Sequence, residues 1–399
     1  MRILVVANLY PPLVEGGAEL ATRRQVAQLR DAGHTVAVLT TDGTIGLRPV
    51  PRPRAGMPCV LETPSPNIYH ILSRPTHRWK RPVWAAFDLF NPISARLVAQ
   101  VCNRVRPDVV ITSNLWNLST SVWRPLAHRA PVIHVLHDGS TVCQTGVFNH
   151  GGFDCFGTLQ PCRAMLAVRR RQSAVVGTLL APSRFLLGAT AEAGLFRRAR
   201  TAYVPNPAPS LPAIVDRAGR RGPLAVAFVG NIERYKGFDI VVGGCVTDAV
   251  ATLHVVGSGD EELISDARTR LGDRLVLHGR VPPEQVAKVL AASDALVMAS
   301  ICHENLPSVV LEGQAAGLTV ISTRSGGTVE VVTDGVDGLL IERGSTDQLR
   351  AALERLVADP ELRLRLGAGG RAIAERRAVR QDCFVATVES TGAHQRSHF

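Results

Sequence analysis

Short apolar segments alternate with helical patterns along most of the chain, and this alternation restricts the fold more than any other feature. In the first half such segments lie at residues 3–7, 35–40, 108–113, 132–137, 178–182 and 201–205. Nearly continuous apolar runs are typical of parallel strands buried on both faces. Residues 19–32 have apolar side chains at helical spacing and end at Gly33. The alternation predicts a parallel sheet with right-handed crossovers and helices on both faces.

The same alternation begins again after a segment rich in proline and arginine, which runs to Pro223 and indicates a hinge. In the second half we expect strands at residues 224–229, 251–256, 274–277, 295–299, 319–322 and 338–341, with helices such as 284–292 and 346–356. A chain of 399 residues also exceeds the usual size of a single core. We therefore predict an α/β protein of two doubly wound, Rossmann-like domains.

The predicted domains are an N-terminal domain of residues 1–208 and a C-terminal domain of residues 209–379. A last helix at about residues 380–399 is expected to pack back on the first domain. Open parallel sheets bind ligands beyond the carboxyl ends of their strands, so we expect the site in a cleft between the domains. Residues 42–66 are rich in Pro, Gly and Arg without a helical period, which predicts a long irregular loop.

Positive charge is concentrated in the first half. Residues 1–208 contain 24 basic and 10 acidic residues, whereas residues 209–399 contain 21 and 24. A basic field favours an anionic partner such as acidic lipid, a phosphate-bearing acceptor or nucleic acid. Only three of the 45 basic residues are Lys, so a genomic bias toward arginine is an equal alternative. Because no nucleic-acid module or basic–aromatic stripe is present, nucleic acid is not expected as a partner.

The compartment is predicted from what the sequence lacks. The first six residues have the pattern of a buried strand rather than a signal peptide, and no apolar stretch has the length of a membrane span. We therefore expect a cytoplasmic protein whose eight cysteines are reduced. Peripheral contact with an anionic membrane, at the inner face, is expected through Arg78, Lys80 and Arg81 beside Trp79 and Trp84, and a solvated loop is the alternative.

Two glutamates bracket the predicted start of a helix in the second half. Glu304 lies on the loop that enters this helix, Pro307 suits its first turn, Glu312 lies inside it, and Gly317 suits its end. A helix start presents free N–H groups and a positive dipole end, which together attract anions. Two carboxylates beside it can accept hydrogen bonds from sugar hydroxyls. A nucleotide sugar combines these features, because its diphosphate lies between a ribose and a hexose.

The segment from Glu304 to Glu312 resembles the Glu-x7-Glu motif of the retaining GT-B glycosyltransferases of family 4, the glycosyl transferases group 1. Gly326-Gly327, Glu330 and the Asp-Gly-Val-Asp-Gly segment from Asp334 fit the same pattern. The resemblance implies that the donor sugar is contacted by Glu304 and by the segment that follows it, namely Asn305, Leu306, Pro307 and Ser308. It implies that Glu312 binds the ribose hydroxyls.

Other segments extend the resemblance over most of the chain. The Gly230-to-Gly237 loop is similar to the family loop whose cations neutralise the donor diphosphate, and this implies Lys236 as a donor-binding residue. The family has an arginine directly after the glycine, where this chain has Asn231. Arg234 of the same loop is a candidate to compensate. A solvated surface turn is the alternative for these cations.

Three further sites follow from the resemblance. Gly16 and Gly17 after the first strand match the glycine loop over the donor phosphates, although glycines alone are equally explained by a turn. Arg280 and Val281 match the turn whose backbone contacts the nucleotide base. His137 ends a predicted strand, where the family often has a histidine near the transferred sugar, so it is a catalytic candidate alongside Glu304. A purely structural histidine is the alternative.

The chemistry implied by the resemblance needs no cofactor and no metal. The chain contains no Asp-x-Asp triplet to hold a metal on a diphosphate. Cys143, Cys155 and Cys162 are spaced too loosely for a typical structural zinc site. Lys236 and helix N–H groups would stabilise the leaving group, and the departing phosphate oxygen would take the acceptor's proton on the front face.

We therefore expect a retaining hexosyltransferase that moves a sugar from a nucleotide-diphosphate donor to a glycan, lipid-linked or small-molecule acceptor. A nucleotide-sugar epimerase of the same double fold is one alternative. A non-catalytic protein that binds a sugar nucleotide or a lipid is another, favoured if Asn231 abolishes donor activation.

Overall fold

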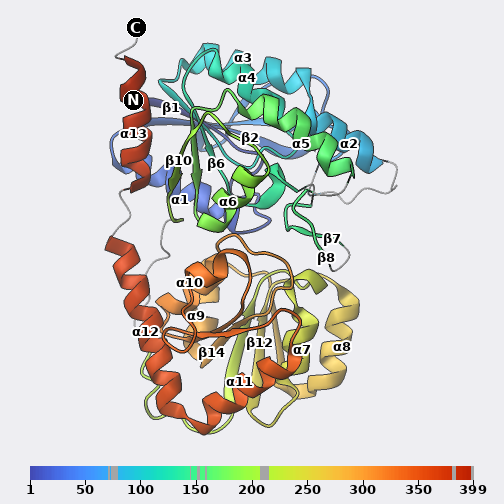
Figure 1. Cartoon of the computed structure of the whole chain (residues 1–399), viewed down its shortest axis with the longest axis vertical. Helices are drawn as coiled ribbons and strands as arrows, with labels where there is room; N and C mark the ends of the chain where they lie inside the picture. Colours follow the sequence, from blue (N-terminus) through green and yellow to red (C-terminus); the bar gives the residue numbers. More distant parts are fainter. Residues whose placement is uncertain are drawn as a thin grey trace. The chain divides into compact units, whose positions relative to one another are not determined.

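The computed structural model describes residues 1–70, 72, 80–143, 145–150, 153–157, 160–206, 215–379 and 383–396 (Figure 1). The chain forms two compact units. Unit 1 contains Met1–His150, Cys155–Pro207 and Asp382–Phe399, and unit 2 contains Gly151–Asp154 and Ala208–Gln381. The predicted hinge lies partly outside the described residues.

Unit 1 is built on one large sheet with the strand order β10-β9-β6-β5-β1-β2-β4-β3. Neighbouring strands are parallel, and only the β3–β4 pair is antiparallel. The strands are β1 (Arg2–Val6), β2 (Thr35–Ile45), β3 (Arg52–Arg54), β4 (Met57–Ser65), β5 (Val109–Thr112), β6 (Val132–Val135), β9 (Thr178–Ala181) and β10 (Arg200–Tyr203). The short strands β7 (Asn149–His150) and β8 (Phe153–Asp154) form a separate pair.

Helices cover both faces of this sheet. Leu4 and Val6 of β1 belong to one core, whereas Ile3 and Val5 belong to the other, because successive side chains of a strand alternate between faces. Helix α1 (Gly17–Asp31) and helix α13 (Cys383–Arg396) contribute to the second core. The remaining helices are α2 (Lys80–Leu89), α3 (Pro92–Val105), α4 (Trp123–Ala127), α5 (Gln160–Ser173) and α6 (Arg184–Glu192). Of these, α3 to α6 contribute to the first core.

The prediction of a long irregular loop at residues 42–66 is wrong. Strand β2 continues to Ile45, and β4 pairs with it in parallel through Val38↔Val60 and Leu39↔Leu61. The many prolines concealed this strand, but they are tolerated because β3, which contains Pro53, lies at the edge of the sheet.

One membrane anchor suggested by the sequence is also not available. Trp84 of α2 is only 7% exposed and stacks on Tyr69 with ring centroids 5.5 Å apart. Arg78 and Trp79 lie outside the described residues. In the described part of the chain, no helix combines the length and apolar character that crossing a bilayer requires.

Unit 2 contains a parallel sheet with the order β13-β12-β11-β14-β15-β16, and this confirms the predicted fold class. Its strands are β11 (Leu224–Val229), β12 (Val250–Val256), β13 (Leu275–Gly279), β14 (Ala295–Met298), β15 (Thr319–Thr323) and β16 (Leu339–Ile341). Its helices are α7 (Phe238–Cys245), α8 (Glu261–Leu271), α9 (Pro283–Ala292), α10 (Ser308–Ala315), α11 (Thr346–Ala358) and α12 (Pro360–Val379). Helices α7, α8 and α11 contribute to one core, and α9 and α10 to the other.

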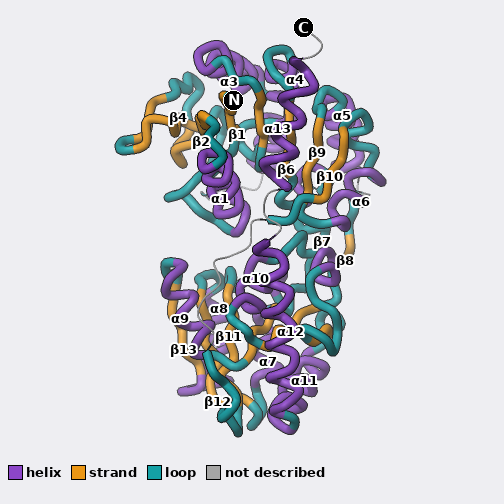
Figure 2. The backbone as a smooth tube through the Cα atoms, turned by 90° about the vertical axis from the view of Figure 1, so that its left-hand side faces the viewer, coloured by secondary structure: helices purple, strands orange, loops and turns teal. Residues whose placement is uncertain are grey.

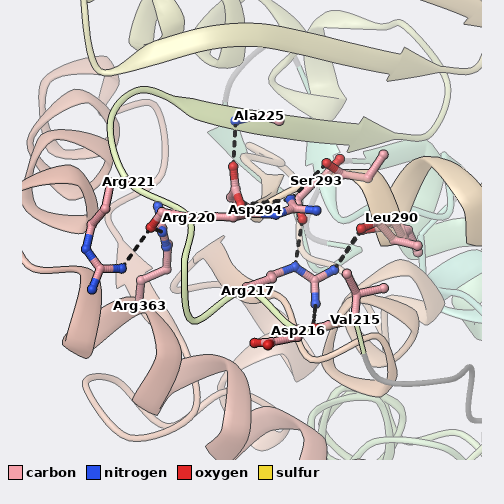
Figure 3. Close-up of polar contacts among 12 residues, drawn as sticks. Val215, Asp216, Arg217, Arg220, Arg221, Ala225, Leu290, Ser293, Asp294 and Arg363 are labelled. Carbon is pink, nitrogen blue, oxygen red and sulfur yellow. Dashed lines mark hydrogen bonds and ion pairs between the residues drawn. The ribbon is translucent and has the colours of Figure 1, made fainter.

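Arginines fix the segment that opens unit 2 (Figure 3). The Arg217 side chain is buried and donates hydrogen bonds at 2.9–3.3 Å to the carbonyl oxygens of Leu290, Ala291, Ser293, Ala316 and Val215. Four of these carbonyls lie at or just beyond the ends of α9 and α10, where backbone oxygens lack intrahelical partners. Arg220 pairs with Asp294 at 3.0 Å. This anchor holds the carboxyl end of α10 against α9.

Candidate functional site

The strand order of unit 2 reverses between β11 and β14, which are neighbours in the sheet. The connection from β11 leads to β12 on one side, whereas β14 leads to β15 on the other. Ligands of open parallel sheets bind at such switch points, beyond the carboxyl ends of the strands. The loop from Gly230 to Gly237 and the loop from Ala299 to Pro307 both leave the sheet here.

A lysine and a glutamate from these two loops form an ion pair. Lys236 Nζ lies 2.7 Å from Glu304 Oε1, and the side chains are 28% and 14% exposed. Ser300 Oγ donates to the same carboxylate oxygen at 2.6 Å. Gly237 allows the approach, because a Cβ atom there would lie 1.9 Å from the Ala299 carbonyl oxygen.

The pair sets the charge of both partners. Burial by itself raises the pKa of Glu304, but the Lys236 ammonium and the hydroxyl of Ser300 lower it more, so the net pKa lies below its ordinary value. Burial by itself lowers the pKa of Lys236, and the Glu304 carboxylate reverses this, so the net pKa is raised. Both groups are therefore ionised at neutral pH.

The backbone of Glu304 is held by the downstream glycine pair. Gly327 N–H donates to the Glu304 carbonyl oxygen at 2.8 Å. A Cβ atom on Gly326, whose φ is +54°, would lie only 2.1 Å from that oxygen. The two glycines therefore allow the loop after β15 to pack directly on the loop after β14. The sequence pointed to this glycine pair without indicating what it contacts.

Helix α10 begins next to Glu304. The sequence placed Pro307 in the first helical turn, but the helix starts at Ser308 and Pro307 is the residue before it, with φ −68° and ψ 112°. No side chain caps the helix start, and Val310 N–H donates to the Pro307 carbonyl oxygen at 3.1 Å, so the N–H groups that α10 offers to an anion are those of Ser308 and Val309. Asn305 is half-buried and Leu306 is buried in the core, on the same loop as Glu304.

The end of α10 is fixed by its glycine. Gly317, with φ +68°, donates to the Gln314 carbonyl oxygen, and Leu318 N–H donates to that of Gly313, each at 3.0 Å. Glu312 lies inside the helix between these two ends and is half-buried.

The loops after β11 and β12 touch backbone to backbone. A Cβ atom on Gly257 would lie 1.9 Å from the Gly230 carbonyl oxygen, and one on Gly259 would lie 2.1 Å from that of Ile232. Ile232 N–H donates to the Ser258 carbonyl oxygen at 3.1 Å. Only glycine permits these approaches, because any Cβ atom would collide with a backbone oxygen. Gly257 and Gly259 therefore allow the two loops to pack against each other.

Arg280 reaches the same loops from the end of β13. Its Nε donates to Ser258 Oγ at 2.9 Å, and its Nη2 lies 3.5 Å from Asn231 Oδ1. The Arg234 side chain is 67% exposed and lies 4.0 Å from the Asp239 carboxylate. Of the two arginines, Arg280 therefore contacts Asn231, whereas Arg234 pairs elsewhere. Val281, which follows Arg280, is half-buried.

In unit 1, His137 lies at the end of β6 in a polar group that the sequence did not predict. Its Nε2 is 3.4 Å from Thr22 Oγ1, which in turn is 3.0 Å from Ser113 Oγ. Thr22 comes from α1, and Ser113 follows β5. Burial lowers the pKa of His137 to about 4, so the imidazole is neutral at pH 7.

The glycine loop of unit 1 forms the start of α1. Gly16 precedes the helix, Gly17 is its first residue, and Gly16 N–H donates to Glu19 Oε2 at 2.9 Å. The Glu19 side chain is buried, which raises its pKa. Gly16 has an extended φ of −164°, and an added Cβ atom would meet nothing within 4 Å. The fold itself does not require glycine at position 16.

Two family models match consecutive parts of the chain. The glycosyl transferase 4-like domain matches residues 16–207, and glycosyl transferases group 1 matches residues 216–373. The chain belongs to the glycosyl transferases group 1. The group 1 model covers the Lys236–Glu304 pair, and the 4-like model covers Gly16 and His137.

Related sequences match this group 1 chain mainly over part of their length. A lipopolysaccharide core biosynthesis glycosyltransferase, LpsE, from Rhizobium meliloti is 34% identical over 39% of this chain and 47% of its own length. A D-inositol 3-phosphate glycosyltransferase from Segniliparus rotundus is 34% identical over 39% of this chain and 38% of its own. An uncharacterized 42.6 kDa protein in the cps region of Klebsiella pneumoniae is 23% identical over 83% and 87%. The chain thus spans under half the length of LpsE and under half the length of the D-inositol 3-phosphate glycosyltransferase.

Solved structures show the same fold over the whole chain. HepE from Anabaena in complex with UDP-glucose has a TM-score of 0.67 at 18% identity, covering 100% of both chains. Sucrose-phosphate synthase from Thermosynechococcus elongatus has a TM-score of 0.73 at 20% identity, covering 100% of this chain and 99% of its own. The fold of this group 1 chain is therefore GT-B.

Beside His137, unit 1 of this group 1 chain contains a small pocket that is lined by polar and apolar side chains and is partly open to solvent. Its lining includes Trp116, Thr120 and Arg169. The Arg169 side chain lies 3.6 Å from the carboxylate of Asp88, and both are buried. Burial raises the pKa of Asp88 to about 6, although Arg169 partly opposes it.

No candidate metal centre is found in this group 1 chain within the described ranges, since no three His, Cys, Asp or Glu side chains there come together. Cys143 and Cys155 lie in the segment after His137, Cys162 lies in the first turn of α5, and all three are buried.

Proposed function

We propose that this group 1 chain is a retaining hexosyltransferase, which uses a nucleotide-diphosphate sugar and a glycan, lipid-linked or small-molecule acceptor. No metal or cofactor takes part in the proposed reaction. The observation that carries the proposal is the Lys236–Glu304 pair, which lies at the switch point of unit 2 beside the uncapped start of α10. A fixed cation and free helix N–H groups are what a diphosphate leaving group requires.

In the proposed donor complex, Lys236 and Arg280 bind the diphosphate together with the N–H groups at the start of α10. Glu304 and the segment Asn305–Ser308 hold the hexose, and Glu312 binds the ribose. The HepE structure contains UDP-glucose on the same fold, which supports a donor of this class. Arg280 takes over the charge that Asn231 cannot supply, because it lies beside that residue.

The proposed transfer breaks the bond between the anomeric carbon and the phosphate oxygen, and forms a bond from that carbon to an acceptor oxygen on the same face. The acceptor's proton passes to the departing phosphate oxygen. Glu304 positions the sugar and is not the nucleophile, because one of its oxygens already accepts hydrogen bonds from Lys236 and Ser300. Neutral His137 acts through hydrogen bonds to hydroxyl groups.

Transfer with purified protein tests the proposal. A panel of nucleotide-diphosphate sugars is first screened for binding, and the product formed with chelator present is examined by NMR for its anomeric configuration. Glu304→Ala should lose at least a hundredfold in kcat. Glu284→Ala, which removes an exposed carboxylate from α9, should keep full activity.

Undiminished transfer by Glu304→Ala would refute the assignment. Conversion of the donor without acceptor would instead indicate an epimerase, and donor binding without any reaction would indicate a non-catalytic protein.

A further inference from the structure

The connection from β2 to β4 in unit 1 exposes a cluster of large apolar side chains. Ile45, Leu47, Val50 and Met57 are 53%, 64%, 58% and 50% exposed. All four lie within the short stretch 45–57, which we name the hairpin patch. An isolated exposed hydrophobic residue needs no explanation, but several on one short segment indicate an interaction surface.

The hairpin patch is also uniformly basic. Residues 43–61 include Arg48, Arg52 and Arg54 but no acidic residue. Arg54 pairs with Glu62 at 2.7 Å, whereas Arg48 and Arg52 are exposed. Of the two acidic residues that flank the segment, Glu62 is paired with Arg54, whereas Asp42 accepts hydrogen bonds from the neutral Thr44 and keeps its charge. The patch itself therefore presents apolar and cationic groups, and Asp42 is a carboxylate at its margin.

Its position in the sheet suits contact with a surface. Strand β3 is the last strand of the unit 1 sheet, next to β4, and this side of the sheet lies opposite the side formed by β9 and β10 (Figure 2). Pro51 and Pro53 lack backbone N–H donors, so this edge is poorly suited to pair with a strand of a second protein.

We propose that the hairpin patch binds the interface of an anionic lipid bilayer, with its apolar side chains inserted and Arg48 and Arg52 at the headgroups. Apolar groups flanked by arginines are the combination that binds such interfaces. A second copy of the chain would meet equal positive charge and an edge interrupted by prolines. This proposal concerns a different unit from the donor site of unit 2 and does not depend on the proposed reaction.

Co-sedimentation of the full chain with vesicles tests the proposal without donor or acceptor. Vesicles of equal parts phosphatidylglycerol and phosphatidylcholine should bind the protein, and pure phosphatidylcholine should bind it much less. Val50→Asp should lower the partition coefficient about tenfold. The control is Val336→Asp, because Val336 of unit 2 is also 58% exposed. Arg52→Gln should lower partition about fivefold, whereas Arg268→Gln, at an exposed site on α8, should leave it unchanged.

Depth measurements provide a second readout. Cys59 is exposed next to the patch, and Cys383 on α13 is also exposed. An environment-sensitive fluorophore on Cys59, in a Cys383→Ser background, should be quenched by lipid-borne nitroxides, and a label on Cys383 in a Cys59→Ser background should not. Absence of binding to acidic vesicles would overturn the proposal, as would equal losses in the patch and control variants. A lipid-free dimer that Val50→Asp dissociates would also overturn it, in favour of self-association.

Discussion

Replacing Lys236 by methionine removes the cation of the switch-point pair while keeping most of the side chain's apolar length. Glu304 then remains 14% exposed with no ammonium beside it. Breaking a fully buried pair costs about 3–5 kcal/mol, and an exposed pair is worth about 1 kcal/mol or less. The exposed fractions of 28% and 14% lie between these cases, so we expect a loss of about 2 kcal/mol at neutral pH.

The loss should depend on pH in a defined direction. In the wild type the pKa of Glu304 lies below its ordinary value of 4.5, so the pair stabilises the protein above that pH and loses this effect as the pH falls. In Lys236→Met, burial acts without the ammonium and raises the pKa above 4.5, so the carboxyl group destabilises the protein as the pH rises. The difference in stability should therefore be largest at neutral pH and should shrink as the pH falls below 4.5.

Scanning calorimetry of the full chain at several pH values measures this difference. A loss of about 2 kcal/mol corresponds to about 4–8 °C in the transition of a unit of this size. Lys288→Met is the matched control, because Lys288 is exposed on α9. The transition of unit 2 is identified by Arg217→Met, which perturbs only that unit. Equal losses at pH 4 and pH 8, or an equal loss in the control, would refute the reasoning.

Three further predictions concern the site. Arg280→Ala should raise KM for the donor about tenfold with little change in kcat, because it removes one charge-assisted hydrogen bond to the donor. Arg234→Ala should change neither constant. Steady-state kinetics measure both, and a larger effect of Arg234→Ala than of Arg280→Ala would contradict the assignment. Gly326→Ala should destabilise the protein by about 2 kcal/mol or more, because the new Cβ atom meets a backbone oxygen. The control is Gly344→Ala, which also has a positive φ of +78° but open space around the new Cβ atom, and it should cost about 1 kcal/mol. Calorimetry measures both losses. The pKa of His137 is lowered to about 4, so its contribution to stability should be full above pH 6.5 and should decline by about 2 kcal/mol for this half-buried ring as the pH falls toward 4. His137→Gln should remove this part of the decline and leave the part due to His134, whose pKa is lowered to about 3; unchanged pH dependence would count against the prediction.

The sequence by itself determined the elements of unit 2 closely. Strand β11 occupies the residues expected for it, Leu224–Val229, because a buried parallel strand is a local apolar run that needs no partner to be recognised. The sequence signal for the helix start after Glu304 was equally local, although the helix begins one residue later than expected, after Pro307. Local signals failed for β4, because its residues are rich in proline and become a strand only by pairing with β2.

Only the tertiary structure decided which side chains meet. Lys236 and Glu304 are 68 positions apart, and they form an ion pair because β11 and β14 are neighbours at the point where the strand order reverses. Arg280 lies 49 positions from Asn231 and reaches it from the end of β13, which no spacing in the sequence indicated. The physical reason is that a side chain's type and periodicity are set along the chain, whereas strand order is set by how whole elements bury their apolar faces together.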